Sequence, residues 1–305
     1  MKRVITAVIL IPLVLLAIFK LPLWALTILV GLVALLATDE YLRIVAGHNL
    51  DPMRMPTFLL VSVFYAMTLL SFLQKTAWGL AHIKTLQSIL EPGSYVFFIL
   101  SPLLYLTIGL KVKPLSSFLA SAAAGSLALF YIAFTLVRLL AVVGLSKGPV
   151  LLVYGLVVVW IGDIAAYYTG RAIGKHLLAP KVSPKKTWEG TIASLLFSVL
   201  AGCFLLLKSA AVVDFFVNIH LLQAPASLSV LSAKNSVWLA ILASASINIA
   251  AQVGDLAESA MKRGANIKDS GSLLPGHGGV LDRIDALLFA APVLWYYAST
   301  NVIHF

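Results

Sequence analysis

Hydrophobic residues in this chain form long runs, separated by short segments that are rich in charged residues, proline and glycine. A helix needs about 20 apolar residues to cross a hydrocarbon core of roughly 30 Å. Nine runs approach or exceed that length, at residues 4–19, 21–38, 57–74, 93–110, 116–143, 149–170, 190–207, 236–254 and 284–300. The pattern predicts an all-α, polytopic integral membrane protein with about nine transmembrane helices.

Two of these runs allow a second interpretation. The run at 4–19 follows Lys2 and Arg3 and has the form of a signal peptide, but another span begins almost at once and no small-residue cleavage site is evident. We interpret it as a retained first helix. The run at 116–143 is long for one helix, and its Ala/Ser/Gly-rich start at 116–126 is either part of the span or a separate re-entrant piece.

Composition narrows the class of protein. The 305 residues are 61% hydrophobic and only 11% charged, with a mean hydropathy of +1.00. Soluble domains carry roughly 25% charged residues, so a soluble enzyme, a disordered tail and a coiled coil are excluded. The single cysteine, Cys203, cannot form an intrachain disulfide, and we expect it to be a packing residue.

The net charge of +10 has an uneven distribution along the chain. With the N-terminus inside, 15 of the 22 basic residues and 10 of the 12 acidic residues fall on the inner side. Cytoplasmic loops of membrane proteins are enriched in Lys and Arg. The distribution therefore predicts a cytoplasmic N-terminus, chemistry that faces the cytoplasm, and contact with anionic membrane lipids rather than with nucleic acid.

Polar residues at the inner end of the sixth run could carry chemistry. Asp163, Tyr167 and Arg171 recur at helical spacing and share one face. A structural ion pair between Asp163 and Arg171 is one interpretation. Because an acidic residue inside a span costs about 2.5–3.5 kcal/mol, we favour a substrate or ion site.

The loop after the sixth run is a candidate phosphate-binding segment. It contains two prolines, Pro180 and Pro184, and holds Ser183, Lys185, Lys186 and Thr187 just before a helix start. A basic cluster beside the membrane is often attracted only to anionic lipid. Here the stiff loop, the ammonium groups and the backbone N–H groups of a helix start could together hold a phosphate chain.

The richest polar segment begins where the eighth run ends. Continuing that helix places Asp255, Ser259 and Lys262 on one face, and Asp282 and Asp285 stand one turn apart at the start of the ninth run. A solvated loop with balanced charges is the simpler interpretation. Carboxylates beside phosphate-binding cations are, however, the oxygen ligands that Mg²⁺ prefers, and unpaired charge at a membrane edge is costly.

Residues of this segment match a long motif. They are Ser259, Met261, Lys262, Arg263, Lys268, Asp269, Gly271, Leu274, Pro275, His277, Gly278, Gly279, Val280, Asp282, Arg283, Ile284 and Asp285. This motif resembles, without a departure, the signature of phosphatidate cytidylyltransferases, also called CDP-diacylglycerol synthases. Residues 162–171 and 183–190 are similar to upstream motifs of that family. The resemblance covers about residues 155–300, while the N-terminal half matches only as hydrophobic spans.

The resemblance implies that a cytidylyl group passes from CTP to phosphatidic acid, giving CDP-diacylglycerol and pyrophosphate. It also implies Mg²⁺, a second cation such as K⁺, a homodimer, and a bacterial inner membrane with the site facing the cytoplasm. We expect residues 1–145 to form a transmembrane scaffold and residues 146–305 the catalytic region.

The motif positions then take roles by residue type. We expect Asp255, Asp282 and Asp285 to hold the metal. The expected catalytic residues are Lys186, Lys262, Arg263, Asp269 and Arg283. The expected substrate-binding residues are Asp163, Arg171, Ser183, Lys185, Thr187, Ser259, Lys268, His277, Gly278 and Gly279.

Two other functions use similar residues. A CTP-dependent polyprenol kinase would share the metal and nucleotide chemistry but would need a base to take the proton of a lipid alcohol. An ion-coupled transporter would place its carboxylates near the bilayer midplane, usually in repeated halves. The full signature favours the cytidylyltransferase over both.

Overall fold

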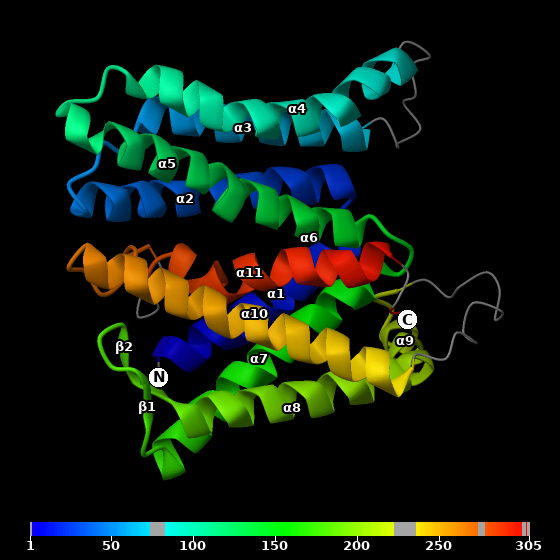
Figure 1. The fold of residues 1–305 in the computed structure, drawn as a ribbon. Helices are drawn as coiled ribbons and strands as arrows, with labels where there is room; N and C mark the ends of the chain where they lie inside the picture. Colours follow the sequence, from blue (N-terminus) through cyan, green and yellow to red (C-terminus); the bar gives the residue numbers. More distant parts are fainter. Residues whose placement is uncertain (1, 74–82, 223–235, 274–277, 301–302, 304–305) are drawn as a thin grey trace. The chain divides into compact units, whose positions relative to one another are not determined.

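The computed structural model describes residues 2–73, 83–222, 236–273, 278–300 and 303 of the chain (Figure 1). Its first half contains α1 (Lys2–Lys20), α2 (Leu23–Gly47), α3 (Arg54–Leu73), α4 (Ile83–Gly109), η1 (Leu115–Ser117), α5 (Phe118–Ala128), η2 (Leu129–Phe134) and α6 (Thr135–Val143). Its second half contains α7 (Gly148–Ile173), β1 (Leu177–Ala179), β2 (Ser183–Thr187), α8 (Trp188–Leu207), α9 (Ser209–Asn218), α10 (Val237–Gly264) and α11 (Leu281–Ser299).

Each hydrophobic run that the sequence marks falls on helical structure. Within the described residues, six helical segments are long and apolar enough to cross a membrane: Leu23–Gly47, Arg54–Leu73, Leu115–Val143, Gly148–Ile173, Trp188–Leu207 and Val237–Gly264. The predicted helical membrane architecture is confirmed in this coarse form. The count of nine spans and the side of the N-terminus stay predictions.

The fifth run forms one helical segment. A 3₁₀ turn, an α-helix, a π-helical turn and a second α-helix follow one another without a break from Leu115 to Val143. The Ala/Ser/Gly-rich start is therefore continuous with the rest of this helical segment. Because Ala, Ser and Gly are small, this part can approach neighbouring helices closely.

The helices group into two compact units, each assembled from separate stretches of the chain. Unit 1 comprises residues 1–21, 138–260 and 284–305, and unit 2 comprises residues 22–137 and 261–283. Most of the segment that matches the family motifs belongs to unit 1, but residues 261–283 belong to unit 2. The predicted division of roles at residue 145 stays a prediction.

In unit 1, α7, α8 and α10 lie side by side (Figure 1), and small and polar residues fill the contacts among them. A Cβ on Gly162 would lie only 2.6 Å from the Ser198 hydroxyl oxygen and 2.8 Å from that of Ser194. Asn248 of α10 donates to both hydroxyls, at 3.0 Å to Ser194 and 2.9 Å to Ser198. In a bilayer, buried polar groups must find partners inside the protein, and this network supplies them.

In unit 2, a fully buried tyrosine fixes the packing of α3, α4 and α5. The side chain of Tyr105 is 0% exposed, and its hydroxyl donates to Thr57 Oγ1 at 2.9 Å. The ring lies against Gly125 so closely that a Cβ there would overlap with it. A side chain at position 125 would collide with this ring, so packing rather than backbone conformation requires a glycine there.

One element departs from the all-helical prediction. Residues 177–187, expected to be a loop, form a short antiparallel hairpin in which Leu177 pairs with Thr187 and Ala179 with Ser183. Two prolines and three lysines hide the strand pattern in the sequence. The hairpin joins the end of α7 directly to the start of α8.

The glycine beside Tyr105 gives a stability prediction. Gly125→Val should lower the free energy of unfolding by about 1–3 kcal/mol, because a rigid buried ring cannot yield to the added methyl groups. Ala123, on the exposed side of the same helix, is the matched control. Ala123→Val should change the free energy by less than about 0.5 kcal/mol. Thermal unfolding in detergent measures both, and equal midpoints for the two variants would contradict this account of the packing.

Candidate active site

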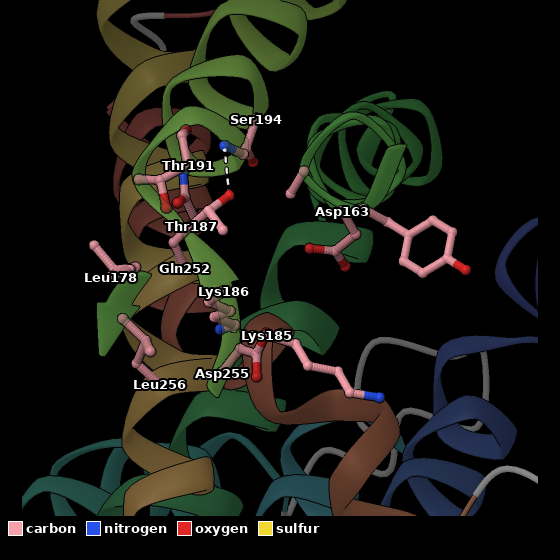
Figure 2. A pocket seen from close by; sticks show the side chains of 13 residues that line it. Asp163, Leu178, Lys185, Lys186, Thr187, Thr191, Ser194, Gln252, Asp255 and Leu256 are labelled. Atoms are coloured by element: carbon pink, nitrogen blue, oxygen red, sulfur yellow. Dashed lines mark hydrogen bonds and ion pairs between the residues drawn. The ribbon is translucent and has the colours of Figure 1, made fainter. Parts of the chain in front are cut away.

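A cavity of about 270 Å³ opens in unit 1 among α7, the hairpin, α8 and α10 (Figure 2). It is lined by Asp163, Ala166, Tyr167, Leu178, Lys185, Lys186, Thr187, Gly190, Thr191, Ser194, Gln252, Asp255 and Leu256. Its volume is near the lower end of the range for ligand pockets, about 300–1,000 Å³. The lining brings together all three polar segments that the sequence singles out, because each contributes at least one residue.

The α7 wall carries the predicted polar face. Asp163 and Tyr167 line the cavity, and Figure 2 shows the Asp163 carboxylate directed into it. Arg171 donates to the Tyr167 hydroxyl at 3.4 Å, which confirms that the two residues share one face of the helix. The lining of the cavity does not include Arg171, so this arginine lies beside the cavity rather than in its wall.

The hairpin wall ends in a helix cap. Thr187 has extended backbone angles, and its hydroxyl accepts a hydrogen bond from the Gly190 backbone N–H at 3.2 Å. The sequence predicted this helix start. Gly190 and Thr191 in the first turn of α8 line the cavity together with Lys185 and Lys186, and a helix N-terminus carries the positive end of the helix dipole. Ser183 begins the same strand but is outside the lining.

An ion pair joins the hairpin to α10. Lys186 Nζ lies 2.6 Å from Asp255 Oδ2, and the two side chains are 27% and 36% exposed. Figure 2 shows the two side chains close together at one side of the cavity. Ser259, one turn further along α10, directs its hydroxyl toward Asp255 Oδ1 at 3.5 Å. Both charges remain partly accessible from the cavity, so an incoming anion or cation can compete for them.

Within unit 1, α10 and α11 approach closely beside Asp255. A Cβ on Gly254 would lie 2.7 Å from the backbone oxygen of Asp285. The Asp285 carboxylate accepts from the N–H of Ala286 at 2.8 Å. The backbones of α10 and α11 are therefore close together at Gly254 and Asp285.

The other predicted carboxylate lies in unit 2. Asp282 Oδ1 is 2.5 Å from Lys262 Nζ, and Oδ2 accepts from the backbone N–H groups of Ser270 at 2.9 Å and Gly279 at 2.8 Å. Burial raises the pKa of Asp282. The hydrogen bonds from Lys262, Gly279 and Ser270, with the lysine charge, outweigh burial and hold the pKa below its usual value. Asp282 is therefore an ionised and fully bonded carboxylate.

Four further charged residues of the motif, Arg263, Lys268, Asp269 and Arg283, are exposed in unit 2. Arg263 donates to the Ile267 backbone oxygen at 3.0 Å. Gly278 has a φ of +78°, a backbone conformation that favours glycine. His277 lies outside the described residues, so its predicted part in a nucleotide loop stays a prediction.

The carboxylates suit a magnesium ion in their chemistry. Among the described residues, no group of three or more His, Cys, Asp or Glu side chains is close enough to hold a metal ion. Mg²⁺ is usually bound by one or two carboxylates together with substrate phosphates and water, so a three-residue cluster is not required. Asp255 fits this pattern because it is partly exposed beside the cavity. The oxygens of Asp282 are already occupied by Lys262 and two backbone N–H groups.

Sequence reasoning missed two features of the site. Gln252 lines the cavity, donating at 2.6 Å to Asn248 and at 3.4 Å to the Thr191 backbone oxygen. Its position three residues before Asp255 on one helix face is a signal that could have identified it. The second feature is Glu40, which accepts a hydrogen bond from Ser270 within the signature motif although it lies more than 200 residues earlier in the chain. No local pattern in the sequence indicates that contact.

The sequence matches the model of the cytidylyltransferase family over residues 1–301. The chain belongs to this family.

Relatives with curated names are called phosphatidate cytidylyltransferase. The protein of Staphylococcus haemolyticus is 40% identical over 49% of each chain, and that of Haemophilus influenzae is 42% identical over 49% of this chain and 46% of its own. The protein of Brucella suis is 34% identical over 78% of this chain and 81% of its own. The chain thus spans about half the length of the Staphylococcus and Haemophilus relatives that it matches.

The helix cap at the cavity gives a second stability prediction. Thr187→Val keeps the shape of the side chain but removes the oxygen that accepts from Gly190, so the free energy of unfolding should fall by about 1 kcal/mol. Thr187→Ser keeps the oxygen and should retain most of the stability. Thermal unfolding in detergent compares the two variants. If the serine variant loses as much stability as the valine variant, the hydroxyl does not cap α8.

Proposed function

We propose that the protein is a CTP:phosphatidate cytidylyltransferase, which transfers CMP from CTP to phosphatidic acid and releases pyrophosphate. The main support for this proposal is the cavity that Lys185, Lys186 and the capped start of α8 line together with Asp255. Cations and helix N–H groups bind phosphates, and a neighbouring carboxylate suits the cation that phosphates carry. The names of the relatives supply the substrates.

The chemistry needs alignment more than it needs a base. A phosphate monoester has a second pKa near 6, so phosphatidic acid is largely ionised at neutral pH. Its phosphate oxygen attacks the α-phosphorus of CTP, a new P–O–P bond forms, and the bond to the β-phosphate oxygen breaks with pyrophosphate as the leaving group. The protein must bring two anions together. Lys185 and Lys186 neutralise phosphate charge, and the first turn of α8 orients it.

In this proposal Asp255 would hold Mg²⁺, and Asp282 and Asp285 stay the other predicted metal ligands. A bound Mg²⁺ neutralises charge that develops on the phosphates. Lys262, Arg263, Asp269 and Arg283 stay predicted catalytic residues and Lys268 a predicted substrate-binding residue, as the family resemblance implies. The K⁺ ion and the homodimer that the family resemblance implies stay predictions.

We also propose that the site faces the cytoplasm of a bacterial inner membrane, with the N-terminus inside. The concentration of basic residues in the loops on that side supports this topology. It gives CTP direct access to the hairpin. The acyl chains of phosphatidic acid remain in hydrocarbon, as their apolar surface requires.

The reaction can be tested with purified protein. Radiolabelled CTP and phosphatidic acid should yield CDP-diacylglycerol only when Mg²⁺ is present. Asp255→Asn should lower kcat/KM about 100-fold or more, because the proposal requires its charge. Asp214→Asn on α9, outside the cavity lining, is the matched control and should be unaffected. If a polyprenol is phosphorylated instead, the kinase alternative replaces this proposal, and if neither lipid reacts, transport becomes the function to test.

A second test asks whether the position of Lys186 matters beyond its positive charge. Lys186→Met removes both a phosphate-binding cation and the partner of Asp255, so kcat/KM should fall about 100-fold. Lys181→Met removes an exposed charge from the turn of the same hairpin, which is outside the cavity lining. It should change kcat/KM less than twofold. Steady-state kinetics with CTP as the varied substrate measure both. Equal losses would mean that the hairpin contributes only general positive charge.

A further inference from the structure

In unit 2, a buried carboxylate on a distant helix contacts the signature segment, by which we mean residues 270–271 and 279–282 of the motif. Glu40, near the end of α2, is 6% exposed. Its Oε2 accepts from the Ser270 hydroxyl at 2.8 Å and from the Leu281 backbone N–H at 2.8 Å, while Oε1 accepts from the Val280 backbone N–H at 2.9 Å. Three donors from a segment more than 200 residues away thus converge on one side chain.

The same segment holds Asp282. Ser270 donates its backbone N–H to Asp282 and its hydroxyl to Glu40, and that hydroxyl oxygen also accepts from the Asp282 backbone N–H at 3.3 Å. Val280 directly precedes α11 and Leu281 is its first residue. The first N–H groups of a helix have no partners within that helix. Glu40 therefore caps α11 from outside and stabilises the end that bears Asp282.

Two glycines show how closely the segment fits around Glu40. A Cβ on Gly271 would lie 2.5 Å from Glu40 Oε1, and a Cβ on Gly279 would overlap with Glu40 Oε2. Both glycines belong to the motif, and neither has a positive φ. Because the backbone at both positions lies this close to the Glu40 carboxylate, neither position has room for a side chain.

We propose that Glu40 is a positioning residue, which fixes the segment around Asp282 and thereby the Asp282–Lys262 pair. This inference rests on the proposed function, because it assigns that pair to the binding of CTP. A buried carboxylate is costly, and an apolar side chain of similar volume is often as stabilising. Three charge-assisted hydrogen bonds to one segment instead specify a single arrangement of that segment.

Hydrogen exchange tests the contact without reference to activity. In Glu40→Gln, an amide NH₂ replaces one acceptor and must face at least one N–H or O–H donor. The backbone amides of Gly279, Val280 and Leu281 should exchange at least tenfold faster than in the unaltered protein. Asp39→Asn is the matched control, because the neighbouring Asp39 pairs only with Arg43 and Arg54 among the described residues. Its exchange in that segment should not change. Unaltered exchange in Glu40→Gln would overturn the proposal.

Kinetics distinguish positioning from a loss of stability. Fewer folded molecules would lower Vmax and leave KM unchanged, whereas displacement of the Asp282–Lys262 pair in every molecule should raise the KM for CTP at least fivefold. Asp39→Asn should keep the KM of the unaltered protein. A Glu40→Gln protein with an unaltered KM for CTP would refute the positioning role.

Gly271→Ala provides an independent perturbation that leaves the charge in place and serves if Glu40→Gln does not fold. Its methyl group displaces the same carboxylate, so it should also raise the KM for CTP and speed exchange. The double variant should be no worse than the more severe single variant, because both act on one contact. If the effects of the two substitutions on KM multiply in the double variant, the proposal is contradicted. If the unaltered protein makes no CDP-diacylglycerol, the proposed function fails, and exchange alone then decides whether Glu40 holds the segment.

Discussion

Charge at the ends of apolar helices is the constraint on which this structure depends. A carboxylate or an ammonium group at a membrane edge must be paired, hydrated or hydrogen-bonded inside the protein. Asp255 pairs with Lys186, Asp282 pairs with Lys262, and Glu40 is bonded to backbone and hydroxyl donors. Each of these contacts joins segments that are distant in the sequence. The charged groups that a membrane protein can least tolerate are therefore the ones that set the positions of its loops.

The two lysine–carboxylate pairs differ in accessibility, and this difference suits different roles. The Lys186–Asp255 pair is about one-third exposed and lies in the cavity wall. The Lys262–Asp282 pair is only 11% and 5% exposed, and the aspartate carries two further hydrogen bonds from the backbone. The first pair can exchange partners with an incoming phosphate or cation. The second is held in one arrangement, which is what a segment that must present backbone and side-chain groups in fixed directions requires.

The sequence was most informative about the helices and least informative about what joins them. Hydropathy located each run because apolar length is a local property, but it placed the C-terminal ends of two helices too early. The second run ends at residue 38 in the prediction, whereas α2 continues to Gly47, and α10 continues ten residues beyond residue 254 to Gly264. Those extra turns contain charged residues, which hydropathy counts as loop although they remain helical outside the apolar region.

The candidate site shows the same distinction between local features, which the sequence predicted, and tertiary contacts, which it did not. Helical spacing predicted the shared faces of Asp163 with Tyr167 and of Asp255 with Ser259, because these depend on one helix each. The pairing of Lys186 with Asp255 depends on a hairpin that no alternating pattern marks. The contact of Glu40 with Ser270 depends on the packing of α2 against a segment at the other end of the chain. Such contacts follow from tertiary packing, so a single sequence carries no local sign of them.

The Lys186–Asp255 pair also bears on the energetics of the proposed reaction. CTP and phosphatidic acid are both anions, and bringing them together in a cavity of low dielectric is unfavourable unless cations are already present. A lysine held beside a carboxylate is ordered before the substrate arrives, so little side-chain entropy is lost when a phosphate replaces the carboxylate as its partner. The carboxylate that is released then faces the same phosphates and can hold the cation that they carry. Substrate binding would thus exchange one set of ion pairs for another within the cavity, without leaving a buried charge unpaired.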